Sequence, residues 1–197
     1  MHSVLTRAGC SRWLVLLICS LQLLGCAQII NVTTSEPIQL SPYKRSLGTK
    51  IDDIQLATVA RVNLKKASDE LAEARINIDC FNGYLLLTGQ VPSVELRELA
   101  TTTLSTIHGL RELHNHLSVA PDVKITTLSY DTWLTTKLKT KLMVNRQIDS
   151  GRIRIVTEAK TVFLMGLVSR YQAERITEIA STTRGVGAVV KVFEYVD

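Results

Sequence analysis

Two kinds of hydrophobic pattern alternate along the chain and predict its elements. Apolar and polar residues alternate over 75–81 and again over 84–91, which is typical of half-buried strands. The residues between these runs are Asn82 and Gly83, a pair that favours the tight turn of a β-hairpin. Further patterns predict helices over 51–68 and 94–107 and a last strand over 110–119. The predicted order is therefore α-β-β-α-β.

The same unit occurs a second time further along the chain. The run LLLTGQV at 85–91 returns as VFLMGLV at 162–168, an offset of 77, and Asp53 aligns with Asp131 at an offset of 78. Blocks that recur in the same order within small insertions indicate a tandem duplication of a unit of about 70 residues. Positions at which the copies agree are candidates for the fold, and positions at which they differ are candidates for function.

The duplicated unit predicts an α+β fold. A hairpin is antiparallel and the last strand returns through a helix, so each copy is expected to form a mixed three-stranded sheet packed on two helices. We place the first domain at 50–119, a linker at 120–129 and the second domain at 130–197. A unit of about 70 residues is only marginally stable alone, so the two copies are expected to pack together.

The N-terminus has the parts of a secretory signal. Arg7 and Arg12 precede an apolar run over 13–24 that is too short to cross a bilayer comfortably. Gly25-Cys26 follows, and a small residue before cysteine at this place resembles the bacterial lipobox. We therefore predict a signal peptide at 1–25, covalent lipid including palmitate on Cys26, and a lipidated flexible tether at 26–49. The alternative is an uncleaved membrane anchor.

One cysteine remains after these assignments. Cys10 and Cys19 leave with the signal and Cys26 carries lipid, so Cys80 has no partner for an internal disulfide. Cys80 lies in an alternating run, and we interpret it as a packed strand residue rather than a nucleophile.

Charge is distributed unevenly between the copies. Residues 50–119 hold 7 basic and 9 acidic side chains, a net charge of −2, whereas residues 129–197 hold 11 and 7, a net charge of +4. Two interpretations are open: drift on solvated faces, or a second copy that meets an anionic surface. Nucleic acid is excluded as a partner because the predicted signal places the chain outside the cytoplasm.

The first helix of the second copy carries the clearest difference. Its predicted core stripe, Leu134, Leu138 and Leu142, aligns with Leu56, Ala60 and Leu64. Beside that stripe lie Trp133, Lys137 and Lys141, where the first copy has Gln55, Val59 and Asn63. An indole flanked by ammonium groups suits a membrane interface, and Tyr130 would extend the aromatic contact. The alternative is that Trp133 packs against the rest of the protein and the lysines are ordinary solvated residues.

Several motifs together resemble the BON domain of bacterial envelope proteins. Each copy has a strand ending in Leu-Thr-Gly or Leu-Met-Gly, at 87–89 and 164–166, followed by a serine, a helix and a closing strand. Two such units behind a lipobox resemble the outer-membrane lipoproteins of that family. This resemblance implies a non-enzymatic lipoprotein on the periplasmic face of the outer membrane. It also implies that the second BON domain binds anionic phospholipids, and that the protein localises to division sites and maintains envelope integrity.

The resemblance and the copy comparison together give a candidate site. The predicted phospholipid-binding residues are Tyr130, Trp133, Lys137, Leu138, Lys139 and Lys141, with Lys139 contributing only long-range charge. The alternative function is a protein-interaction module, in which the acidic first domain supports outer-membrane protein assembly machinery. A lipid binder should lose function on Trp133→Glu, whereas a docking module should tolerate that change and fail with changes in the first domain.

Other candidates for chemistry are weak. His114 and His116 project to one face of a predicted strand, but two histidines without a third ligand do not favour a metal site. Asp52 and Asp53 begin a predicted helix, where carboxylates cap the positive end of the helix dipole. No phosphate-binding loop or catalytic triad motif is visible, so we predict no enzyme activity and no cofactor.

Overall fold

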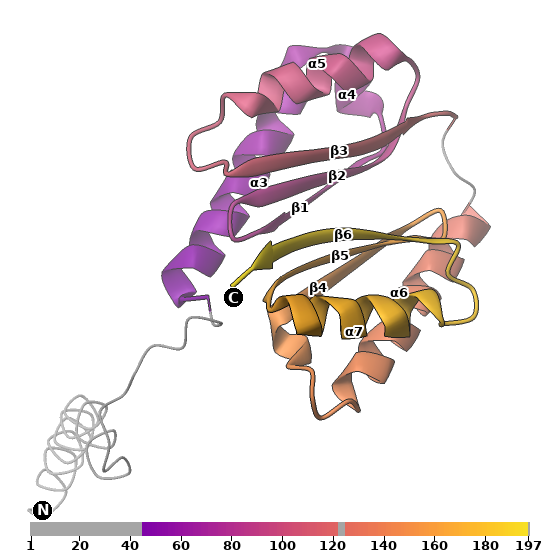
Figure 1. Ribbon diagram of the computed structural model, residues 1–197. Helices are drawn as coiled ribbons and strands as arrows, with labels where there is room; N and C mark the ends of the chain where they lie inside the picture. Colours follow the sequence, from indigo (N-terminus) through magenta and orange to yellow (C-terminus); the bar gives the residue numbers. More distant parts are fainter. Residues whose placement is uncertain (1–44, 122–124, 197) are drawn as a thin grey trace, which may run out of the picture. The chain divides into compact units, whose positions relative to one another are not determined.

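The computed structural model describes residues 45–121 and 125–196, and it contains the α-β-β-α-β unit twice (Figure 1). The first copy comprises α3 (Leu47–Ala67), α4 (Asp69–Glu73), β1 (Ile76–Phe81), β2 (Tyr84–Val91), α5 (Val94–Ser105) and β3 (Glu112–Val119). The second comprises α6 (Ile125–Met143), the 3-10 helix η2 (Ser150–Arg152), β4 (Ile153–Glu158), β5 (Thr161–Val168), α7 (Arg170–Ser181) and β6 (Ala188–Tyr195). The predicted signal peptide, Cys26 and most of the predicted tether lie outside the described residues.

Each copy has a mixed three-stranded sheet, as predicted. The strand orders are β1-β2-β3 and β4-β5-β6, with β2 and β5 in the centre. The hairpin strands pair antiparallel, and the last strand pairs parallel with the central one. Helices cover one face of each sheet (Figure 1), so the predicted α+β fold class is confirmed.

The helices differ from the predicted ones at their ends. α3 begins at Leu47, inside the predicted tether, because the Ser46 hydroxyl accepts the Thr49 backbone N–H at 3.0 Å and caps the helix. α6 begins at Ile125, inside the predicted linker. The first copy also has a short third helix, α4, which is capped by Ser68 and was not predicted.

The hairpin turn of each copy is held by a buried aspartate from the preceding helix. Asp53 accepts hydrogen bonds of 2.9 Å from both backbone N–H groups of the turn at 82–83. Asp131 does the same for the turn at 159–160, at 2.7 and 2.9 Å. All four turn residues have positive φ, from 48° to 77°. The expected capping role of Asp52-Asp53 is therefore wrong for Asp53, which lies in the second turn of α3 and anchors the hairpin.

The core of each copy lies between its sheet and its helices. The first core is centred on Leu56, Ala60, Leu64, Leu85, Leu87 and Leu104, and the second on Leu134, Leu138, Leu142, Val162, Leu164 and Ile176. The helical stripes predicted to be core are confirmed, because the side chains of these residues on α3 and α6 are buried in both copies. Cys80 is also buried in the first core, as predicted.

The opposite faces of the two sheets pack against each other. Side chains alternate along a strand, so Leu85 and Leu87 face the helices while Leu86 faces the other way. Leu86 joins a third buried cluster with Phe81, Phe163, Met165, Leu167 and Val192. The expected packing between the copies is therefore confirmed, and it explains why the central strands are buried on both faces.

Ion pairs lie around this apolar contact. Glu158 is almost fully buried, forms an ion pair with Arg75 and accepts a hydrogen bond from Gln90 at 2.8 Å. Arg111 makes two hydrogen bonds to Glu194, at 2.7 and 2.8 Å. Burial alone would raise the pKa of Glu194, but its hydrogen bonds, chiefly from Arg111, lower it. These pairs fix the register in which the two sheets meet.

Candidate functional site

The strongest candidate site is an aromatic and cationic surface on α6. The indole of Trp133 is 51% exposed, although tryptophan is usually well buried in folded proteins. The Tyr130 ring lies 5.4 Å from the indole between ring centroids. The Lys137 ammonium lies 4.7 Å from the indole centroid, a distance typical of a cation–π contact. We call the surface formed by Tyr130, Trp133, Lys137 and Lys141 the α6 edge.

Both lysines of the α6 edge are held by the loop that follows α7. Lys137 Nζ donates a hydrogen bond of 2.9 Å to the carbonyl oxygen of Arg184. Lys141 Nζ donates one of 3.0 Å to the hydroxyl of Thr183. These contacts order the two ammonium groups on the side of the helix that carries Trp133. The charges are therefore fixed in place beside the indole.

Two loops add residues that sequence reasoning missed. Lys160, in the turn between β4 and β5, places its ammonium 5.6 Å from the centroid of the Tyr130 ring. Arg184 is exposed in the loop that holds Lys137. Gly185 has φ of +108°, and a Cβ there would come within 2.3 Å of the Tyr130 hydroxyl. Lys160 and Gly185 are identified by their contacts with Tyr130, and Arg184 by the hydrogen bond from Lys137 to its carbonyl oxygen. The spacing of residues along α6 contains no signal for any of them.

The structure does not bring all six predicted residues together. Leu138 is fully buried in the second core, so its assignment as a phospholipid contact is wrong. Its position on the helix places it under the α6 edge, where it supports the surface. Lys139 lies away from Trp133 and borders a hollow of about 390 Å³ together with Asp79 and Arg154.

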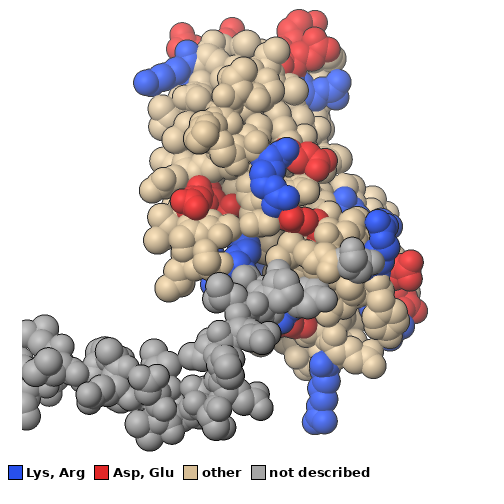
Figure 2. All heavy atoms as spheres, turned by 60° about the vertical axis from the view of Figure 1, so that its left-hand side comes forward, with Lys and Arg blue, Asp and Glu red and all other residues tan. Residues whose placement is uncertain are grey.

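The distribution of charge on the face drawn in Figure 2 does not by itself locate the site. Figure 2 shows basic and acidic side chains interspersed on the face that it presents, without a broad field of one sign. The α6 edge itself is a local cluster of positive charge, formed by Lys137 and Lys141.

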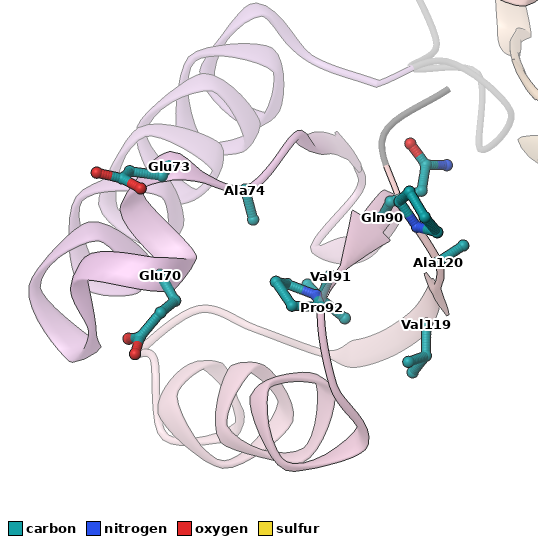
Figure 3. Close-up of a pocket in the computed structure, with 9 residues that line it drawn as sticks. Glu70, Glu73, Ala74, Gln90, Val91, Pro92, Val119 and Ala120 are labelled. Atoms are coloured by element: carbon teal, nitrogen blue, oxygen red, sulfur yellow. The ribbon is translucent and has the colours of Figure 1, made fainter. Parts of the chain in front are cut away.

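The first domain carries a hollow of its own. It has a volume of about 580 Å³ and is lined by Glu70, Glu73, Ala74, Gln90, Val91, Pro92, Val119, Ala120 and Pro121. In Figure 3, two glutamates of α4 border it on one side and the end of β3 on the other. Hydrogen bonds from backbone and from Ser68 lower the pKa of Glu70, which keeps that carboxylate ionised. The described part of the second copy has η2 before β4 and no counterpart of α4.

Cys80, His114 and His116 each contact another side chain of the first copy or of the second sheet. Burial raises the pKa of the Cys80 thiol to about 12, and its S–H donates to Asp53 at 3.3 Å. His114 lies 3.2 Å from Glu112, and His116 packs on the ring of Phe163 with centroids 4.9 Å apart. Among residues 45–121 and 125–196, no group of three or more His, Cys, Asp or Glu side chains is arranged to hold a metal ion. In the same residues, no helix combines the length and hydropathy needed to cross a membrane.

Comparison with known proteins identifies relatives over most of the chain. The "Outer membrane lipoprotein DolP" of Haemophilus influenzae is 33% identical over 183 residues, which cover 93% of this chain and 95% of that protein. The "21 kDa hemolysin" of Actinobacillus pleuropneumoniae is 36% identical over 152 residues, which cover 77% of this chain and 78% of that protein.

Similarity to a solved structure is more distant. The C-terminal domain of CdsD, a structural protein of the type III secretion system of Chlamydia trachomatis, aligns with 13% identity and a TM-score of 0.29. That alignment covers 74% of this chain and 67% of the solved CdsD chain. The sequence model of the BON domain family matches this chain twice, at residues 52–121 and 130–197. The chain therefore belongs to the BON domain family, as a two-domain member of the kind represented by the outer membrane lipoprotein DolP.

Proposed function

We propose that the protein is an outer-membrane lipoprotein that binds anionic phospholipids through the α6 edge of its second BON domain. Lipid on Cys26 anchors it to the periplasmic face of the membrane, and the α6 edge adds a contact that depends on the lipid headgroups. Concentration at division sites and maintenance of the envelope follow from this contact. The protein performs no catalysis in this role, and the covalent lipid is its only attached group.

The observation that carries this proposal is the exposed indole with its ordered cations. An indole prefers the headgroup level of a bilayer, and each lysine or arginine near an anionic surface contributes about 1 kcal/mol. Lys137 and Lys141 lie beside Trp133, and Lys160 and Arg184 lie in the two adjoining loops. Four such charges are enough for weak, reversible binding of the α6 edge to an anionic membrane. The covalent lipid keeps the protein at that membrane, so weak binding is sufficient.

The duplicated unit supports a functional origin for this surface. The positions of Trp133, Lys137 and Lys141 correspond to Gln55, Val59 and Asn63 in α3. The first copy folds with those residues, so the fold does not require an indole or lysines there. The similarity to an outer membrane lipoprotein over 93% of the chain supports the proposed location.

The proposal is tested by titrating the mature chain carrying Cys26→Ser with anionic and zwitterionic vesicles. Trp133 is the only tryptophan outside the predicted signal peptide, so its fluorescence reports on the α6 edge directly. We expect a blue shift with anionic vesicles alone, and weaker binding at high salt because salt screens exposed charges.

Variants make this titration specific. Lys137→Glu keeps the fluorophore and should abolish the shift, and Trp133→Glu should abolish binding measured by cosedimentation. Gln55→Glu changes the equivalent position on α3 and serves as the matched control. A shift of equal size with zwitterionic vesicles, or a response unchanged in Lys137→Glu, would overturn the proposal.

The anchor requires a separate test. We expect the wild-type chain to fractionate with outer membranes and to incorporate labelled palmitate, and Cys26→Ser to do neither. Palmitate incorporation that persists in Cys26→Ser would exclude this cysteine as the modified residue.

A second candidate function is favoured by the hollow in the first domain. Its acidic rim and apolar floor suit a basic and apolar segment of another protein, such as a component of the outer-membrane assembly machinery. If this docking is the main activity, Glu73→Lys or Val119→Glu should impair the envelope while Trp133→Glu is tolerated. The opposite pattern would exclude it.

A further inference from the structure

The outward face of α3 carries a row of exposed aliphatic side chains. Leu47 is 78% exposed, Ile51 55%, Ile54 67% and Val62 44%. Their spacing places them on one side of the helix, opposite the buried stripe, with Thr58 completing the row. We call Leu47, Ile51, Ile54 and Val62 the α3 stripe. Single exposed aliphatic residues are ordinary, but four in a row on one helix indicate a contact surface.

The second copy shows that the fold does not require this stripe. The equivalents of Ile51, Ile54 and Val62 in α6 are Ser129, Thr132 and Thr140. Leu47 is the exception, because its equivalent is the apolar Ile125. The two helices share their buried faces and hairpin aspartates, yet only α3 is aliphatic on this outer face.

Cations adjoin the α3 stripe. Lys50, Arg61 and Lys65 are all exposed. The helical period places Lys50 and Arg61 along one side of the stripe and Lys65 in line with it, after Val62. Of the two carboxylates on α3, Asp53 is buried and paired with Arg45, and Asp52 is turned about 100° away from Ile51. An exposed aliphatic row beside lysine and arginine is the composition of helices that lie in the interface of an anionic membrane.

We propose that the α3 stripe lies in the headgroup region of the membrane that holds the lipid anchor. This inference extends the proposed function to a second surface and rests on acylation of Cys26. Leu47 lies only 21 positions after Cys26, so a fully extended chain allows α3 to lie at most about 70 Å from the anchored residue. The anchor therefore keeps the stripe close to one bilayer throughout the life of the protein.

The exposed area of the α3 stripe is too small for a stable contact with a second copy of the chain. The exposed fractions of the four residues correspond to roughly 450 Å² of accessible surface, whereas a stable protein interface buries about 800 Å² on each partner. A membrane needs no such minimum, because every aliphatic group that enters it adds to the binding of an already anchored chain.

The test uses the full acylated chain in vesicles of phosphatidylethanolamine and phosphatidylglycerol whose acyl chains carry bromine. Ile54→Cys receives a fluorescent label, and Thr102→Cys on the exposed side of α5 receives the same label as the control. Cys80 stays unlabelled because it is buried and its thiol pKa is about 12. Bromine quenches fluorophores that reach the acyl boundary, so we expect quenching of the label at 54 and not at 102.

A second variant introduces the residues of α6. Ile51→Ser and Val62→Thr, combined with the label at 54, leave the core intact because both positions are exposed. Each aliphatic side chain lost should weaken insertion roughly tenfold, so quenching should fall toward the control value. An unquenched label at 54, or quenching that the two changes leave intact, would overturn the inference.

Quenching of Trp133 separates this inference from the proposed function. Trp133 in the unlabelled chain reports the α6 edge in the same vesicles. Quenching of the label at 54 without quenching of Trp133 supports the α3 stripe and contradicts the α6 edge, and the reverse result contradicts the stripe. If the label at 54 escapes bromine in vesicles but crosslinks to an envelope protein in cells, the stripe binds a protein and the membrane proposal fails.

Discussion

Replacing Asp131 with alanine is expected to destabilise the second domain more than any exposed substitution. Its buried carboxylate receives two backbone N–H groups, at 2.7 and 2.9 Å, from the turn between β4 and β5. Asp131→Ala removes both acceptors and leaves the turn amides without a partner inside the protein. The turn residues Ala159 and Lys160 have φ of 48° and 64°, a backbone conformation that residues other than glycine and asparagine rarely adopt.

The magnitude follows from these contacts. A hydrogen bond to a charged group contributes about 1.5–3 kcal/mol, and solvent reaches part of this turn, so we take the lower value for each bond. The expected loss of unfolding free energy is therefore about 3 kcal/mol. Asp131→Asn keeps one acceptor and should lose about half as much. In an unfolding free energy of about 5–15 kcal/mol, such losses are easily measured.

Urea unfolding followed by Trp133 fluorescence measures this loss, because Trp133 lies on the same helix as Asp131. Circular dichroism in parallel reports both domains. Asp149→Ala is the control, because that exposed aspartate caps only the short helix η2, through Gly151 and Arg152, and holds no hairpin. A loss below about 1 kcal/mol in Asp131→Ala would refute the view that the carboxylate holds the hairpin.

Three further outcomes are expected. Replacing Ala159-Lys160 by Asn-Gly, the pair at this turn in the first copy, should raise the unfolding free energy by about 1 kcal/mol in urea, because glycine adopts positive φ without strain; no gain would contradict this. Burial lowers the pKa of His116 below 6.5, so the unfolded chain takes up the proton first. Stability should therefore fall as pH drops below about 6.5, and less so in His116→Gln, which unfolding curves at several pH values will show. Cys80 should resist alkylation at pH 8 until the chain unfolds, because its thiol pKa is about 12; reaction at the rate of a free thiol would show that it is accessible.

The sequence was sufficient for most of the fold because the duplication repeats the pattern. The Asn82-Gly83 turn and the alternating runs around it predict the first hairpin. The second hairpin has Ala159-Lys160 at its turn, which carries no turn signal of its own, and it follows only from alignment with the first. The start of α3 was less predictable, because the hydroxyl of Ser46 sets it and serine is frequent along the chain. α4 is too short to show a helical period.

The candidate site was predictable only along α6. Trp133 and Lys137 lie four residues apart on one helix, so helical periodicity alone brings them together. Lys160, Arg184 and Gly185 come from loops whose approach to Tyr130 depends on the folded sheet. Leu138 shows that a residue next to a site residue in the sequence need not belong to the site. It follows Lys137 directly, but the helix turns its side chain about 100° away, into the core.

We propose that the two copies divide membrane contact between two kinds of force. The α6 edge relies on ammonium groups beside one indole, so salt weakens its attraction to an anionic surface within a Debye length of about 8 Å. The α3 stripe relies on aliphatic groups, which salt does not screen. Apart from Leu47, whose equivalent is Ile125, each helix lacks the feature of the other at the equivalent positions, although both retain a buried stripe and the hairpin aspartate. Contact by the α6 edge should therefore weaken at high salt, whereas insertion of the aliphatic groups of the α3 stripe should be much less sensitive to salt.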